Sequence, residues 1–380
     1  MRLDRDRILE AVESKREQAL AAHRFVHEHP ELAHAEHECA RYLTGVLEDG
    51  GLAVERGAGG METAFRATLA GGRRGRTVGV VALYDAVPVF RPDGRIEAVH
   101  SCGHDAIAAG AVATALALAD LRAELHGSLV VVGCPADEIP APLTVERGSG
   151  KAVALANGVW DGVDAALYAH PEFEDTVFRQ SRWMLRERAL VTGVRSLTGA
   201  PEAPLEAVRA AIAAVAALPP ADAIVEHVRL DGDVEDGGGL IARLHVLLRA
   251  DDEAGLDALS AHVRRAVPGA IWETDDVVAG LEPAASIRAA VRRAVLALGR
   301  EFVDEPPPLP FATDFGNVSH AVPAALIGIG RPGGWAFHTD EGAAQFAADG
   351  AEAALTIARV LALAAADLAD PTTSHESEVP

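Results

Sequence analysis

Four short apolar runs, each flanked by alanine-rich helical stretches, constrain the fold of this chain more than any other feature. The runs cover residues 77–83, 128–133, 165–169 and 325–330. Short and partly β-branched runs that alternate with helices are typical of strands in a largely parallel sheet. We therefore predict an α/β fold in which a mostly parallel sheet is flanked by helices.

Side chains of metal-binding types follow these runs. They are Asp85 after the first run, Asp137 and Glu138 after the second, His170 after the third and His338 after the fourth. Ligands bind beyond the carboxyl ends of the strands in such sheets, so residues far apart in the sequence should converge on one edge. The sequence therefore predicts a site at that edge.

The segment 99–105, with the sequence VHSCGHD, is the densest group of such side chains. It brings Cys102 and His104 into one turn, and the alanine-rich run 106–120 that follows predicts a helix. Thiol and imidazole groups are the ligands that zinc prefers in proteins. A metal site that includes this turn is the prediction.

Other cysteines and histidines are interpreted as structural residues. Cys39 and Cys134 are typical of small buried hydrophobic side chains. The histidines of a dense N-terminal group fit a helix-turn-helix with solvated faces rather than a metal site. This group comprises His23, His27, His29, His34 and His37.

The composition argues against several classes of binding partner. The formal net charge of −22 disfavours nucleic acid and anionic membrane and favours a small-molecule substrate. Three cysteines are too few for a disulfide framework, so we expect a cytoplasmic protein. No apolar run approaches the length of a membrane span, and the first residues predict an amphipathic helix rather than a signal peptide.

A change of pattern near residue 183 indicates a second domain. The candidate ligands stop there, and a separate set of strand-like and helical runs continues to about residue 281. Strands are predicted at 189–194, 223–230, 240–248 and 270–278, and helices at 204–217 and 253–267. We predict a discontinuous metal-binding catalytic domain, 1–182 and 281–370, an inserted α+β lid or dimerisation domain, 183–280, and a disordered tail, 371–380.

Ordered sequence motifs extend over nearly the whole chain. The first are HEHPEL at 27–32 with Glu36, GGMETAF at 59–65, YDAVP at 84–88 and CGHD at 102–105. The later ones are GSGK at 148–151, DAALYAHP at 164–171, TDFGNVS at 313–319 and HT at 338–339. Together they resemble the dinuclear metallohydrolases that include aminoacylases, carboxypeptidase G and hippurate hydrolase. The later motifs resemble the aminobenzoyl-glutamate hydrolase-like and dipeptidase-like branch of that family.

The resemblance implies a complete metal site with two divalent ions per chain, Zn²⁺ or Mn²⁺. The implied ligands are Cys102, His104, Glu138, His170 and His338. Their thiolate, imidazole and carboxylate donors suit both ions, and a thiolate placed between two ions would be shared. By the same resemblance Asp137 is the general base, and Asp85 orients a ligand.

The implied function is amide hydrolysis by a homodimer that associates through the inserted domain. The substrate would be an N-acyl amino acid or a dipeptide-like small molecule. Candidates for substrate contacts are Arg195, Arg249 and Asn317. Arg249 directly follows the predicted strand 240–248 and could bind a substrate carboxylate through two parallel hydrogen bonds. The alternative is an arginine on the protein surface without this role.

Three departures from the family pattern leave other functions open. The lid histidine of the family is absent from 193–201, its asparagine is absent from 236–241, and Asp137 replaces a glutamate. Loss of one oxyanion donor can cost about 10²–10³ in turnover. The alternatives are a homologue recruited to biosynthesis, with amide-forming, lyase or rearrangement chemistry, and a catalytically silent binding protein.

Overall fold

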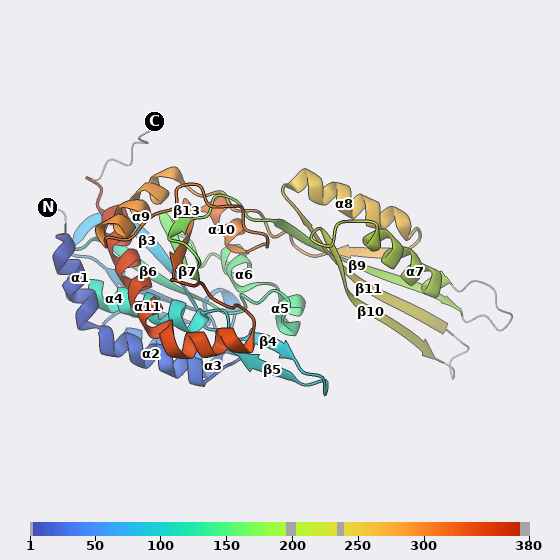
Figure 1. Cartoon of the computed structure of the whole chain (residues 1–380), viewed down its shortest axis with the longest axis horizontal. Helices are drawn as coiled ribbons and strands as arrows, with labels where there is room; N and C mark the ends of the chain where they lie inside the picture. Colours follow the sequence, from blue (N-terminus) through green and yellow to red (C-terminus); the bar gives the residue numbers. More distant parts are fainter. Residues whose placement is uncertain (1–2, 195–202, 234–238, 373–380) are drawn as a thin grey trace. The chain divides into compact units, whose positions relative to one another are not determined.

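The computed structural model describes residues 3–194, 203–233 and 239–372. The chain divides into two compact units (Figure 1). The first unit contains Met1–Arg179, Leu281–Pro307 and Asn317–Pro380, and the second contains Gln180–Gly280 and Pro308–Gly316. The predicted disorder of the tail 371–380 falls almost wholly outside the described residues.

A seven-stranded sheet forms the centre of the first unit, with the strand order β1-β2-β6-β3-β7-β13-β8. In that order the strands are Ala53–Arg56, Phe65–Ala70, His126–Cys134, Arg73–Leu83, Ala165–Glu172, Ala324–Gly330 and Thr176–Val177. The four adjacent strands β6, β3, β7 and β13 are parallel, whereas the outer pairings are antiparallel. The prediction of an α/β fold with a mostly parallel sheet is confirmed.

Helices cover this sheet (Figure 1). The long ones are α1 (Arg5–Ser14), α2 (Arg16–Glu28), α3 (His37–Asp49), α4 (His104–Asp120), α9 (Ala285–Ala297) and α11 (Asp340–Ala369). The short elements are η1 (Ala58–Gly60), α5 (Pro142–Arg147), α6 (Gly150–Ala156), α10 (Phe315–Ala321) and the hairpin of β4 (Val87–Phe90) and β5 (Ile96–Val99).

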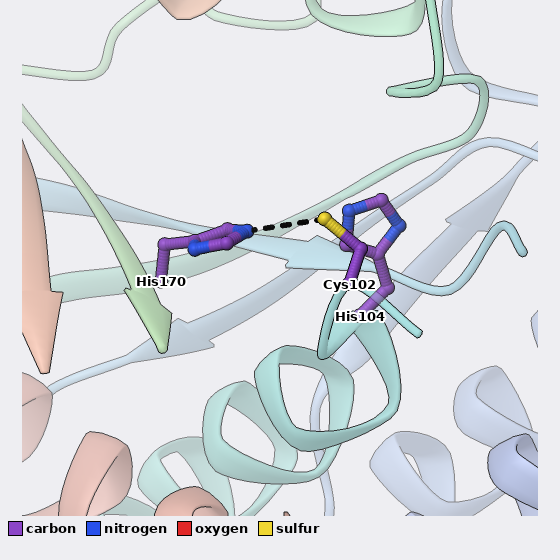
Figure 2. A group of neighbouring side chains, drawn as sticks. All are labelled: Cys102, His104 and His170. Atoms are coloured by element: carbon purple, nitrogen blue, oxygen red, sulfur yellow. Dashed lines mark hydrogen bonds between the residues drawn. The ribbon is translucent and has the colours of Figure 1, made fainter. Parts of the chain in front are cut away.

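Helix α4 is buried along His104–Leu118, which accounts for its largely small or apolar sequence. It packs closely against α11, and a β-carbon at Gly110 would lie 2.5 Å from Ile357. Glycine at this position therefore permits the close approach of the two helices. The packing fixes the first turn of α4, where His104 stands (Figure 2).

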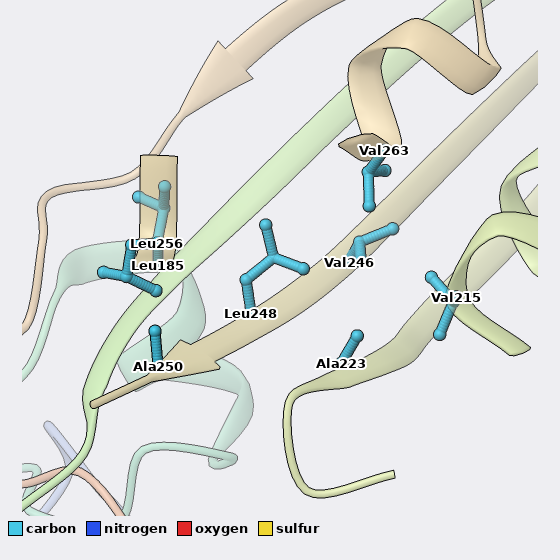
Figure 3. Close-up of a cluster of buried hydrophobic side chains, with 8 residues drawn as sticks. All are labelled: Leu185, Val215, Ala223, Val246, Leu248, Ala250, Leu256 and Val263. Atoms are coloured by element: carbon cyan, nitrogen blue, oxygen red, sulfur yellow. The ribbon is translucent and has the colours of Figure 1, made fainter. Parts of the chain in front are cut away.

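The second unit is a four-stranded antiparallel sheet with the order β10-β11-β9-β12. Its strands are Ala223–Asp233, Gly239–Ala250, Trp183–Val194 and Ile271–Thr274, and its helices are α7 (Ala203–Ala216) and α8 (Glu253–Ala266). Alternate residues of β11 are buried, as expected of a strand with one covered face. Leu248 and Val246 lie in a core with Leu185, Leu256 and Val263 (Figure 3).

Local differences from the sequence-based expectations are small. The sequence pattern predicts two helices between residues 6 and 47, with a break at residues 29–30, but the structure has three, because the first ends at Ser14. Lys15 is the cap between α1 and α2 and has a non-helical backbone. None of the described helices is long and apolar enough to cross a membrane.

Candidate metal centre

The predicted ligands come together in the first unit, from the parallel sheet, from the turn after the β4–β5 hairpin and from the start of α4. Cys102 stands in the turn after β5, and His104 begins α4. Glu138 comes four residues after the end of β6, and His338 lies between β13 and α11. His170 was expected just beyond its strand, but it lies inside β7, because that strand continues for two more residues.

Gly103 shapes the turn between the first two candidates. Its φ of 91° lies in the left-handed region, which glycine adopts without strain. A β-carbon here would lie 2.7 Å from the ring of Phe346 and 2.8 Å from the ring of Pro171. The turn therefore excludes any larger residue, and this holds the side chains of Cys102 and His104 close together.

Cys102 is shared by two groups of possible ligands. One is Cys102, His104 and His170, and the other is Cys102, Glu138 and His338; within each group the ligand atoms lie within 4.8 Å of one another. The Cys102 Sγ is 3.6 Å from Nε2 of His170 and 3.4 Å from Nε2 of His338. Figure 2 shows the sulfur directed toward the His170 ring. Five donors with one shared thiol form a geometry that can hold two ions.

Hydrogen bonds fix two of the imidazoles so that Nε2 faces this group. Nδ1 of His104 lies 2.8 Å from the carbonyl and 2.9 Å from Oδ1 of Asp85. Nδ1 of His170 lies 2.6 Å from the carbonyl of Pro171. An Nδ1–H held by an oxygen leaves Nε2 as the unprotonated, metal-binding nitrogen. Asp85 also accepts the backbone N–H of Glu138 at 2.9 Å, so it orients two candidates.

Asp137 lies between a cation and the His104 ring. Its Oδ1 contacts the ammonium of Lys151, and its Oδ2 is 3.4 Å from Nε2 of His104. Burial opposes ionisation, but Lys151 and His104 outweigh it and hold the pKa of Asp137 well below its usual range. Asp137 is therefore a carboxylate at neutral pH, as a proton acceptor must be.

The donor set fits divalent cations. Among the described residues, Nε2 of His104 and Oε1 of Glu138 are buried side-chain atoms without a hydrogen-bond partner. Buried polar atoms are normally satisfied, so such atoms indicate an ion or ligand in the functional protein. Burial opposes ionisation of Cys102, but the three histidines hold the pKa of its thiol well below its usual range, which favours the metal-binding thiolate.

A sequence profile described as "Peptidase family M20/M25/M40" matches residues 82–364. The chain belongs to this family. Its members are hydrolases that act on C–N bonds, so this M20 protein is an enzyme of that class. The resemblance deduced from the motifs is thereby confirmed.

Two curated relatives and one solved structure illustrate the match. The chain is 30% identical to one of the p-aminobenzoyl-glutamate hydrolase subunits of Escherichia coli over 43% of this chain and 34% of that protein. It is 28% identical to the mouse Xaa-Arg dipeptidase over 83% of this chain and 77% of that protein. The match thus spans about a third of the first relative and most of the second.

The solved structure is a Bacillus subtilis protein described as a dinuclear metal binding peptidase of the M20 family. It superposes with a TM-score of 0.63 at 21% identity, covering 91% of this chain and 98% of that one. At this identity the likeness establishes the fold of the M20 protein.

The three predicted substrate contacts fall in different parts of the chain. Arg195 lies outside the described residues, together with most of the segment 193–201 and part of 236–241. Arg249 lies on β11 in the second unit, where its guanidinium donates to the carbonyl of Pro220 at 3.5 Å. Asn317 lies on α10 and belongs to the first unit. All three stay predictions.

One sequence-based interpretation is wrong. His23 does not face solvent, because it is 5% exposed, and its Nε2 lies 3.3 Å from Oδ2 of the fully buried Asp105. Nδ1 of His27 lies 2.7 Å from the same oxygen. The spacing of four residues between the two histidines, which places them on one helix face, was the available signal.

Lys151 and Glu36 are further candidate residues of the site in the M20 protein, and the sequence analysis singled out neither of them individually. Both are fully buried, although lysine and glutamate are almost always exposed. Burial and the nearby charge of Asp85 raise the pKa of Glu36 to about 8. Each belongs to a motif of the family resemblance, and this was the only signal of its importance.

Proposed function

We propose that the protein is a cytoplasmic metal-dependent amidohydrolase that cleaves the amide bond of an N-acyl amino acid or a dipeptide-like small molecule. The observation that carries this proposal is the shared position of Cys102 between two groups of ligands, with the carboxylate of Asp137 beside them. The three cysteines are free thiols, in keeping with a reducing compartment.

Two divalent ions, Zn²⁺ or Mn²⁺, would be held by five residues. These are Cys102, His104, Glu138, His170 and His338. When bound, such a pair lowers the pKa of a water molecule and polarises an amide carbonyl. Asp85 would keep His104 in the metal-binding tautomer through the contacts at Nδ1.

Asp137 would carry the proton transfer. As a carboxylate it can take a proton from the attacking water and return it to the leaving amine nitrogen. Lys151 would hold Oδ1, which leaves Oδ2 on the side of His104 to face the reacting atoms. The aspartate is shorter than the glutamate of the family by one methylene, about 1.5 Å of bond length. The Lys151 contact would define the position of this shorter side chain.

The relatives favour a substrate in which an amino acid borders the scissile amide. The names of two of them, p-aminobenzoyl-glutamate hydrolase and Xaa-Arg dipeptidase, both describe such a bond. The net charge of −22 is consistent with a small molecule rather than a polyanion.

The test combines elemental analysis with an activity panel. Protein purified without chelator should contain close to two divalent ions per chain, and Cys102→Ala should lose most of this metal while keeping the circular dichroism of the wild type. The metal-loaded protein should hydrolyse members of a panel of N-acyl amino acids and dipeptides. Failure to retain or take up Zn²⁺ or Mn²⁺ would refute the metal centre. Full loading without hydrolysis would favour the biosynthetic or silent alternatives.

We also propose that the second unit carries a dimer contact. It exposes large apolar side chains on its strands and on α7, and an exposed apolar surface is typical of a protein interface. They are Val194, Ile212, Ile224, Val228, Leu230 and Ile271. Light scattering should give a dimer for the intact chain and a monomer after deletion of the second unit. A monomeric intact chain would contradict the proposal.

A further inference from the structure

Among the described residues, three that are not glycine have a left-handed backbone. They are His34, Ala136 and His338, with φ of 60°, 58° and 59°. A side chain with a β-carbon is strained in this region, so the surrounding structure must hold such a residue in place. Ala136 directly precedes Asp137, and its conformation therefore sets the direction in which the proposed base leaves the backbone.

The carboxyl group of Glu36 contacts two of these three residues. Its Oε1 accepts the backbone N–H of Ala136 and that of His34, each at 2.9 Å. Its Oε2 accepts the hydroxyl of Thr63 at 2.8 Å. Glu36 is 0% exposed, so water does not compete for these hydrogen bonds.

The peptide groups on both sides of Ala136 are held. Glu36 binds the N–H on one side, and the carbonyl on the other side accepts the N–H of Gly150 at 3.2 Å. A β-carbon at Gly150 would lie 1.7 Å from the carbonyl oxygen of Pro135, so only glycine allows this approach. Because both peptide planes are fixed, so are the two torsions between them.

We propose that Glu36 is a positioning residue for Asp137: it holds Ala136 in the left-handed conformation and thereby directs the base into the site. The inference rests on the proposed function of Asp137. Without Glu36, a change of Ala136 to a relaxed conformation would rotate the following peptide and move the Asp137 carboxylate away from Lys151 and His104. A displacement near 1 Å can cost roughly 10² in rate.

Two substitutions at residue 36 separate the hydrogen bonds from the packing. Glu36→Gln keeps a carbonyl oxygen that can accept both N–H groups, whereas Glu36→Met has a similar length and no such acceptor. With metal content equal, we expect kcat of Glu36→Gln within about fivefold of the wild type and kcat of Glu36→Met lower by roughly 10². KM should change less than kcat, because the residue does not contact substrate.

The decisive variant is Glu36→Met combined with Ala136→Gly. Glycine adopts a φ near 58° without strain and does not need the Glu36 hydrogen bond, so the double variant should recover at least tenfold of the lost kcat. The matched control is Glu36→Met combined with His34→Gly. His34 is the other left-handed residue whose N–H donates to Oε1 of Glu36, and its replacement by glycine should recover none of the lost kcat. Equal recovery by both glycines, or by neither, would overturn the proposal.

A crystal structure of metal-free Glu36→Met gives a readout independent of activity. The expected result is a negative φ at residue 136, and an unchanged φ near 58° would overturn the inference. If the wild type hydrolyses no amide although φ changes as expected, only the proposed function fails, and the hold of Glu36 on Ala136 stands.

Discussion

Replacing Lys151 by methionine should strongly destabilise the first unit. The Lys151 ammonium is fully buried against Asp137 and lies 5.2 Å from the centroid of the Tyr168 ring. Removing one partner of a buried ion pair costs about 3–5 kcal/mol, because the remaining charge is left uncompensated. The Asp137 side chain is 18% exposed and close to His104, so we expect a loss of stability at the lower end of this range, about 3 kcal/mol. Methionine keeps the apolar stem, which limits any cavity.

Calorimetry of the metal-free protein measures this effect, with the second unit as an internal reference. For a unit of this size, about 3 kcal/mol corresponds to a decrease in Tm of roughly 6–12 °C. The transition of the second unit should not move. Adding Asp137→Asn to Lys151→Met removes the unpaired charge and should recover at least half of the loss.

A matched control is Lys15→Met. Lys15 pairs at 2.6 Å with Asp120, whose side chain is 51% exposed, and an ion pair open to solvent contributes about 0–1 kcal/mol. The reasoning is refuted if Lys151→Met costs no more than this control, or if the double variant recovers nothing.

Three further predictions concern other parts of the chain. Asp137→Asn should lower kcat/KM by roughly 10²–10⁴, and Asp137→Glu should lower it as well, because Lys151 fixes the shorter side chain; full activity of the asparagine variant would remove Asp137 from the mechanism. Burial and, to a smaller extent, the positive charge of Arg188 lower the pKa of His245. The folded state therefore binds fewer protons than the unfolded state, and stability is lost as pH falls below about 6.5. Urea unfolding of the second unit should therefore depend less on pH between about 7 and 5 in His245→Asn than in the wild type, and equal dependence would contradict this. Gly103→Ala should destabilise the first unit by about 1–3 kcal/mol and lower its metal content, because the new methyl group meets Phe346 and Pro171; normal metal content would count against the role of this turn.

The central sheet could be predicted from the sequence because its strands are buried on both faces. Residues 78–83 of β3 are all buried, so they form a continuous apolar run with no competing helical period. The turn around Cys102 and His104 could be predicted for a related reason, since its ligand types are adjacent in the sequence. Strand ends were less certain: the two residues after His170 extend β7, and nothing in the local pattern indicates this.

The contacts that position the site could not be predicted because they join distant residues. Glu36 and Ala136 are 100 positions apart, and the left-handed alanine has no signature in the sequence, since glycine or asparagine is the usual residue there. Lys151 is an ordinary surface residue by type, and only the tertiary structure shows its burial against Asp137. His23 is likewise polar by type but buried beside Asp105.

The position of β13 in the sheet has a consequence for biosynthesis. This strand pairs with β7 on one side and with β8 on the other, although it follows β8 by almost 150 residues. While the ribosome makes the second unit, the β7 edge of the nascent sheet has no neighbour, and β8 has no strand to join. His338 follows β13, so the ligand set is incomplete until the chain has been made almost to the start of α11. The proposed metal site can therefore form only late in synthesis, and until β13 is made the nascent chain has an open strand edge, which is prone to aggregation.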